Sequence, residues 1–89
     1  MNEVTLEWSS GKREARITDL SSGGCYVDTI ATIPEGEHIS FELRTADGGS
    51  LALKGEVAYA MPGFGFGIKF VDLSDEAIAT LDRIIKNAA

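Results

Sequence analysis

The chain has 89 residues, 44% of them hydrophobic and 25% charged, which fits one small globular domain. Eight basic against fourteen acidic residues give a net charge of −6, which disfavours generic binding to DNA, RNA or an anionic membrane. A single cysteine excludes an internal disulfide, and with a single histidine a Cys/His zinc site is excluded too. The sequence has neither an apolar run of membrane-spanning length nor a signal-peptide pattern, so we expect a cytoplasmic protein without membrane insertion.

Several segments alternate apolar and polar residues with a period of two, which is the pattern of half-buried β-strands. The predicted strands are residues 4–8, 13–18, 25–29, 38–44, 51–59 and 64–70. Hairpin turns are expected at residues 9–12, 46–49 and 61–63. Pro34 argues against a central strand between the third and fourth segments, so we expect a connection there that crosses the end of a barrel or sheet. Cys25 falls in an alternating segment and is expected to be a buried small hydrophobic residue.

Glycines interrupt the last two predicted strands. The apolar face of the fifth strand would consist of Leu51, Leu53, Val57 and Tyr59. Gly55 lies within this face, where a bulge or a close backbone approach is expected. One face of the sixth strand would consist of Phe64, Phe66, Ile68 and Phe70. Gly65 and Gly67 would lie on its other face, which predicts that a helix or another backbone covers that face closely.

Residues 75–87 form the one predicted helix. Ser74 is a suitable N-cap, and Asp75 and Glu76 suit the positive end of the helix dipole. Its apolar face would consist of Ile78, Leu81 and Ile85. The fold class is therefore all-β: a small six-stranded antiparallel β-barrel over about residues 3–71, with one C-terminal α-helix, in a single domain of residues 1–89. Packing of the helix on its own barrel is the default, and packing on a partner is the alternative.

The turn at residues 19–24, Asp-Leu-Ser-Ser-Gly-Gly, joins the second and third predicted strands. Asp and Ser side chains bond to nearby backbone N–H groups, and paired glycines permit unusual backbone angles or close approach. A tight turn is the simplest interpretation. Because Lys12, Arg13 and Arg16 precede it in an otherwise acidic chain, an anion-binding role is the competing hypothesis.

Three motifs, in their order and spacing, resemble those of the PilZ domain, a bacterial family that receives the second messenger cyclic di-GMP. Residues 19–24 fit its Asp/Asn-x-Ser-x-x-Gly motif, residues 55–59 look like its Gly-x-Val-x-Trp strand, and residues 65–70 resemble its closing Gly-x-Gly-Val-x-Phe strand. The resemblance covers the chain from about Val4 to the terminal helix. It implies a signalling module with cyclic di-GMP as ligand and a protein as further partner, with no cofactor, no metal and no enzymatic activity.

The resemblance also implies roles for individual residues. Asp19 and Ser21 would bond the edge of a guanine, whose N1 and N2 groups are donors, and Gly24 would leave room for the ligand. Arg16 is a candidate phosphate contact, although a solvated charge beside Glu14 is the simpler interpretation. Tyr59 stands at the family's tryptophan position, where it could contact a base face, pack in the core or be a solvent-exposed ring.

One part of the family's site does not match. The family uses an Arg-x-x-x-Arg motif upstream of its first strand, and only residues 1–3 precede that strand here. Because a hydrogen bond to a charged group contributes roughly 1.5–3 kcal/mol, we expect direct binding to be weakened or lost without this motif. The alternative is a degenerate PilZ adaptor that acts through protein contacts in motility or pilus regulation.

Overall fold

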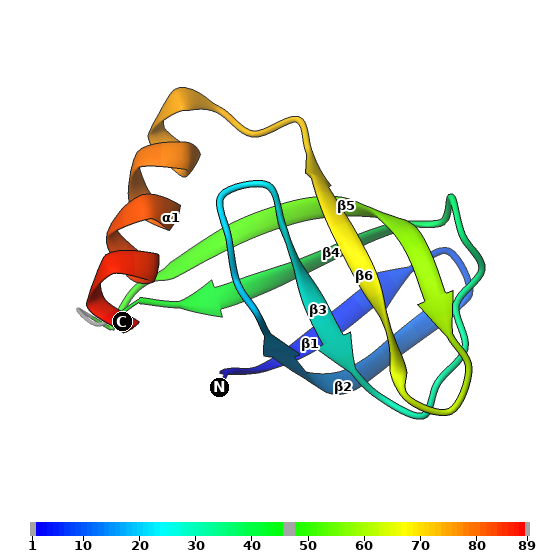
Figure 1. The fold of residues 1–89 in the computed structure, drawn as a ribbon. Coiled ribbons are helices and arrows are strands. Elements are labelled where there is room, and N and C mark those ends of the chain that lie inside the picture. The colour runs from blue at the N-terminus through cyan, green and yellow to red at the C-terminus, as the bar shows by residue number, and fades with distance from the viewer. Residues whose placement is uncertain (1, 46–47, 89) are drawn as a thin grey trace.

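The computed structural model describes residues 2–45 and 48–88, which form six β-strands followed by one α-helix (Figure 1). The elements are β1 (Asn2–Trp8), β2 (Gly11–Thr18), β3 (Gly24–Asp28), β4 (His38–Arg44), β5 (Ser50–Met61), β6 (Gly65–Val71) and α1 (Asp75–Ala88). The strands close into one antiparallel barrel in the order β1-β2-β3-β6-β5-β4. The predicted six-stranded barrel with a C-terminal helix is confirmed. Of the turn predicted at residues 46–49, Ala46 and Asp47 lie outside the described residues.

The connections explain the strand order. The first hairpin is tighter than predicted, because β2 begins at Gly11 and leaves two residues between the strands. β3 pairs with β6 rather than with β4, so residues 29–37 carry the chain from β3 to the other side of the barrel. Ile33 of this connection is buried in the core, and the Gly36 N–H donates to the Val57 carbonyl at 2.8 Å. The connection therefore packs against the barrel instead of looping away from it.

The core is built from the inward faces of all six strands, together with residues of the connection and the helix. Leu81 of α1 is 0% exposed, so the helix packs on its own barrel, as the default interpretation predicted. The N-cap is as expected, because the Ala77 N–H donates to the Ser74 hydroxyl at 3.0 Å. α1, the one helix among the described residues, is not long and apolar enough to cross a membrane.

The apolar face predicted for β5 is wrong at its far end. The ladder between β5 and β6 shifts register between Val57 and Tyr59, which places a β-bulge at Ala58. The extra residue reverses the alternation, so Ala60 turns toward the core and Tyr59 lies on the outer face, 50% exposed. Gly55, where a bulge was one of two expectations, marks a close approach instead. A Cβ there would lie 2.1 Å from a side-chain carbon of Ile68.

The outer face of β6 is closely covered, but chiefly by tyrosine rings. A Cβ added to Gly67 would lie 2.2 Å from a ring carbon of Tyr59, where a helix or a backbone was predicted. At Gly65 the Tyr26 ring and a backbone oxygen of β3 both approach. The prediction that Phe64 shares a strand face with Phe66, Ile68 and Phe70 is also wrong. It lies in the turn before β6 and is 70% exposed.

Cys25 is buried in the core, 7% exposed, as its alternating segment predicted. This burial raises the pKa of its thiol from 9.0 to about 12, because the apolar surroundings disfavour the charged thiolate. The unfolded chain ionises this group near its ordinary pKa, whereas the folded chain keeps it neutral. The thiol is therefore expected to be unreactive in the folded protein.

We expect the free energy of unfolding to fall as the pH rises from about 9 toward 12, because only the unfolded state gains the thiolate in that interval. Urea unfolding of the parent chain and of Cys25→Ala at several alkaline pH values measures this. The variant has no thiol, so its stability should fall less steeply. Equal slopes for the two proteins would contradict the assignment.

Candidate ligand-binding turn

The 19–24 turn is held in a defined shape at the barrel surface. Asp19 takes the left-handed backbone conformation, with φ of 48°, and its side chain is exposed. Leu20 points the other way and packs against the core. The Ser21 hydroxyl donates to the Gly24 carbonyl at 3.1 Å and accepts from the Gly24 N–H at 3.3 Å. With the leucine anchored and Ser21 bonded within the turn, the Asp19 carboxylate is the charged group that the turn presents.

Gly24 is required by the barrel itself. A Cβ at this position would lie 2.0 Å from the backbone oxygen of Ile68 on β6. The same strand also fixes the turn through its backbone, because the Phe70 N–H donates to the Gly23 carbonyl at 2.9 Å. The resemblance explains the glycine by room for a ligand, whereas the contact with β6 requires it whether or not a ligand is present.

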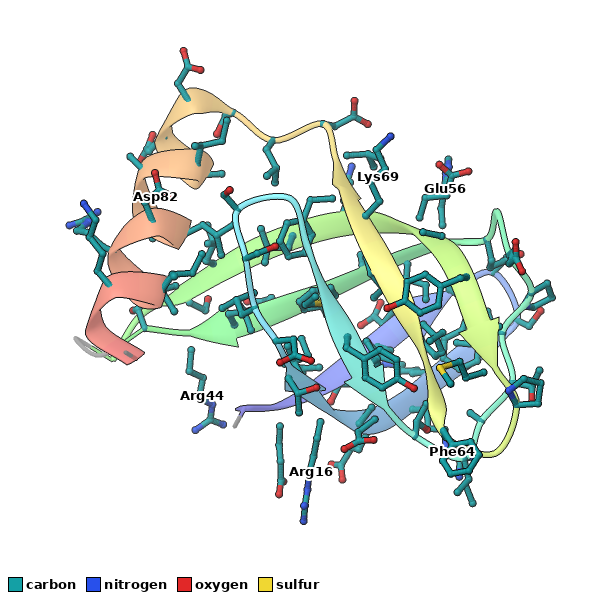
Figure 2. The ribbon with its side chains drawn as sticks, in the orientation of Figure 1. Arg16, Arg44, Glu56, Phe64, Lys69 and Asp82 are labelled. Carbon is teal, nitrogen blue, oxygen red and sulfur yellow. The ribbon has the colours of Figure 1, made fainter. Side chains whose placement is uncertain are left out.

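Lys69 is the cation that the strand order brings to the turn, and the sequence analysis missed it. It pairs with Gly24 on one side and with Glu56 on the other. Figure 2 shows Lys69 and Glu56 close together on the outer face of β6 and β5. The period of β6 predicts an outward side chain at position 69, but its proximity to the turn depends on the pairing of β3 with β6.

Two tyrosine rings lie on the outer face beside the turn. Thr18, which precedes Asp19, pairs with Tyr26, and Tyr26 and Tyr59 flank Gly67 across β3, β6 and β5. The ring centroids are 6.4 Å apart with the planes tilted by 33°. The Tyr59 ring covers Gly67 and is still half exposed, and the Tyr26 ring approaches Gly65. This arrangement offers an aromatic surface on which a base could stack.

Arg16 lies on β2, three residues before Asp19, and faces the end of β3 that is far from Gly24. It pairs with Asp28, the last residue of β3. At roughly 3.3 Å per residue, Asp28 lies about 13 Å along the strand from Gly24. Glu3 is its neighbour on the other side, so the arginine stands between two carboxylates. Figure 2 shows its side chain directed away from the barrel, on the side opposite Lys69. A phosphate contact by Arg16 stays a prediction, and Lys69 is better placed for that role.

The two principal grooves of the described surface lie elsewhere. The larger, about 900 Å³, runs across β1, β4 and β5, and the smaller, about 440 Å³, adjoins Trp8 and His38. Neither is lined by any residue of the 19–24 turn, by Arg16 or by Tyr59. Among residues 2–45 and 48–88, no cluster of three or more acidic, histidine or cysteine side chains could hold a metal ion. These two grooves are therefore separate from the turn.

Comparison with known proteins identifies the fold. The model of the PilZ domain family matches residues 1–87, which is nearly the whole chain. This chain belongs to the PilZ domain family. The solved PilZ domain of CeSA from a cellulose-synthesizing bacterium has a similar fold, with a TM-score of 0.72 and 21% sequence identity, over 97% of this chain and 90% of that one. No curated protein matches the sequence.

Membership in the PilZ family decides the general class of function. PilZ domains are receptors for cyclic di-GMP that act as binding or adaptor domains and not as enzymes, so the family supports a signalling module. Within this PilZ domain, the 19–24 turn is the segment that the sequence analysis matched to the family's ligand motif. The turn, Lys69 and the tyrosine pair together form the candidate site.

The two glycines of the turn make a matched pair for testing its packing. Gly24→Ala is expected to lower the free energy of unfolding by about 2 kcal/mol or more, because the new Cβ collides with the Ile68 carbonyl. Gly23→Ala meets nothing within 4 Å, so we expect a change within about 0.5 kcal/mol. Urea unfolding measures both values, and similar losses in the two variants would refute the close approach.

Proposed function

We propose that this PilZ domain binds cyclic di-GMP at the 19–24 turn and acts by that binding rather than by catalysis. The observation that carries the proposal is the exposed Asp19 carboxylate in a turn held by Leu20 and by the Ser21–Gly24 hydrogen bonds. A carboxylate in this position can accept from the N1 and N2 donors of a guanine edge. The turn exists before the ligand arrives, so little ordering entropy opposes binding.

The neighbouring side chains supply the other interactions that the ligand needs. Ser21 keeps one lone pair of its hydroxyl for a guanine donor, since it accepts from one N–H and donates its proton to a carbonyl. The Lys69 ammonium is a point charge for a phosphate. Tyr26 and Tyr59 offer ring surface to a base. The proposed ligand site thus consists of Asp19, Ser21 and Gly24 of the turn together with side chains from β3, β5 and β6.

Binding rather than catalysis is supported by the position of the histidine. His38 pairs with Glu56, which pairs with Lys69, which pairs with Gly24. Three strand spacings of roughly 4.8 Å therefore separate the histidine from the start of β3, about 14 Å along the curved sheet. His38 is therefore too far from the serines of the turn to hydrogen-bond to them and act as their base.

The affinity of these 89 residues is expected to be weak. They include no arginine pair upstream of β1, and an ammonium cannot reproduce the bidentate grip of a guanidinium on a phosphate. Lys69 also has Glu56 as a neighbour, which reduces the positive potential that a phosphate would meet. The proposal thus predicts measurable but modest binding, which calls for a method suited to high dissociation constants.

Titration of the ¹⁵N-labelled chain with cyclic di-GMP, followed by NMR, tests the proposal. We expect saturable shifts at residues 19–24 and at Lys69, and a loss of affinity of about tenfold or more in Asp19→Ala because a charged hydrogen bond disappears. Asp82→Ala is the matched control, since it removes the same charge from an exposed position on α1. Its affinity should stay within about twofold of the parent chain.

Cyclic di-AMP is the matched control ligand, because it has the same charge but lacks the guanine N1 and N2 donors. We expect it to bind at least several-fold more weakly than cyclic di-GMP. Equal affinities for the two dinucleotides would contradict the proposed role of Asp19 as an acceptor for the guanine edge. If the chain gives no shifts with cyclic di-GMP at millimolar concentration, direct binding by these residues is refuted.

A second candidate function is that of an adaptor, and one feature of the surface favours it. Apolar side chains gather at one end of the barrel in what we call the end patch: Ile30, Tyr59, Met61 and Phe64. Ile30 and Phe64 are 75% and 70% exposed, and the Thr29 N–H donates to the Phe64 carbonyl, which ties the two segments together. Exposed apolar groups that lie together are typical of protein contact surfaces. A partner in motility or pilus regulation is the expected class.

The adaptor hypothesis predicts that Phe64→Ser weakens a partner interaction at least tenfold, because an aromatic anchor leaves the contact. Ile78→Ser on α1 is the control, as it removes an exposed apolar side chain outside the end patch. Quantitative pull-down with a candidate partner from these systems measures both. Equal effects of the two substitutions, or loss of binding in Asp19→Ala alone, would contradict the assignment of the end patch.

A further inference from the structure

The barrel is closed by β1 and β4 at one point. Among the described residues these strands share one register pair, Glu7 with Ser40, whereas β1 and β2 share seven. Continuing the antiparallel register would place Thr5 opposite Glu42 and Glu3 opposite Arg44. Those pairs are not formed, and Figure 1 shows the two strands separating toward the start of β1.

The incomplete closure leaves strand edges available. Along residues 2–6 of β1 and 41–44 of β4, the backbone groups that face the seam have no ladder partner on the opposite strand. Such an edge accepts hydrogen bonds from an added extended segment, which is the basis of recognition by strand addition. Residues 11–15 of β2 also lack a ladder partner on the side of β3. The β1–β4 seam differs from that edge in having a groove over it.

A groove of about 900 Å³ lies over this seam. Buried apolar residues of three strands reach its floor: Val4, Phe41 and Leu53. Acidic residues from four parts of the chain line its walls: Glu3, Glu7, Glu14, Glu42 and Asp72. Arg44 and Lys54 are the two basic residues of the lining, so carboxylates outnumber cations there by five to two.

We propose that the β1–β4 groove receives an extended segment of a partner protein that carries lysine or arginine at alternate positions. Successive side chains of a strand point to opposite faces. One face of the added strand would bring its cations to the wall carboxylates, while the other would rest on the apolar floor. The seam edges would supply the backbone hydrogen bonds that fix its direction and register.

The negative charge of the groove favours a cationic segment over a second copy of the chain or a nucleotide. A second copy of the chain would bring a net charge of −6 toward an acidic groove, which disfavours self-association through the seam. An anionic nucleotide meets the same repulsion, so the groove is separate from the turn proposed to bind cyclic di-GMP. The partner segment is therefore selected both by its positive charge and by its ability to extend.

A synthetic peptide of sequence Lys-Val-Lys-Thr-Lys-Val-Lys with blocked ends is the probe, titrated into the ¹⁵N-labelled chain. We expect saturable shifts in residues 3–6 and 41–44 and little change in residues 19–24. The same peptide N-methylated at alternate residues keeps its charge but loses backbone donors. Its affinity should fall at least tenfold, whereas attraction by charge alone would leave the two peptides equal and overturn the strand-addition proposal.

Charge-reversal variants locate the binding. Glu42→Lys is expected to weaken the peptide at least fivefold, and Thr5→Lys provides a second groove substitution should the first fail to fold. Asp82→Lys on α1 makes the same charge change as the first variant outside the groove and should stay within twofold. Equal weakening by Asp82→Lys overturns the site. If the NMR signals of the seam residues shift with protein concentration in the absence of peptide, a second copy of the chain occupies the groove. That result would overturn the proposal of a cationic partner segment.

Discussion

The pairing of β3 with β6 is the constraint on which the candidate site depends. It brings the backbone of Gly24 so close to the Ile68 carbonyl that no side chain fits between them. The same ladder sets Lys69 beside the turn and places Gly67 between two tyrosines. A packing requirement of the barrel thus fixes the positions of a carboxylate, a cation and an aromatic surface relative to one another. The recognition proposed for the turn would rely on a backbone contact that is itself structural.

Local patterns predicted most of the fold. The alternation in residues 38–44, the N-cap at Ser74 and the turn at residues 19–24 each depend on neighbours in sequence, so each could be read from the chain. Family resemblance located the turn as a ligand motif. Lys69 could not be linked to it, because β3 and β6 are far apart in sequence. Tyr59 was assigned to the wrong face because the bulge at Ala58 has no glycine or proline to mark it.

The surface divides into regions with different charge and chemistry. The turn region combines the Asp19 carboxylate, the Lys69 ammonium with its neighbour Glu56, and two rings, which suits a small planar ligand with a phosphate. The groove at the β1–β4 seam is acidic with an apolar floor, and the end patch is apolar. The turn itself and the seam groove share no lining residue, whereas Tyr59 belongs to both the turn region and the end patch. That combination suits a module that passes a chemical signal to another protein.

The bulge in β5 has a consequence for how such a site can arise. Side-chain direction in a strand depends on the parity of position, so one inserted residue exchanges the inner and outer sets beyond it. Here the exchange sends a tyrosine outward and a small alanine inward, where Phe66 already fills the core. The chain gains an exposed ring without any change in its aromatic content. The length of a strand, rather than its composition, determines whether this residue packs inside the barrel or lies exposed on its surface.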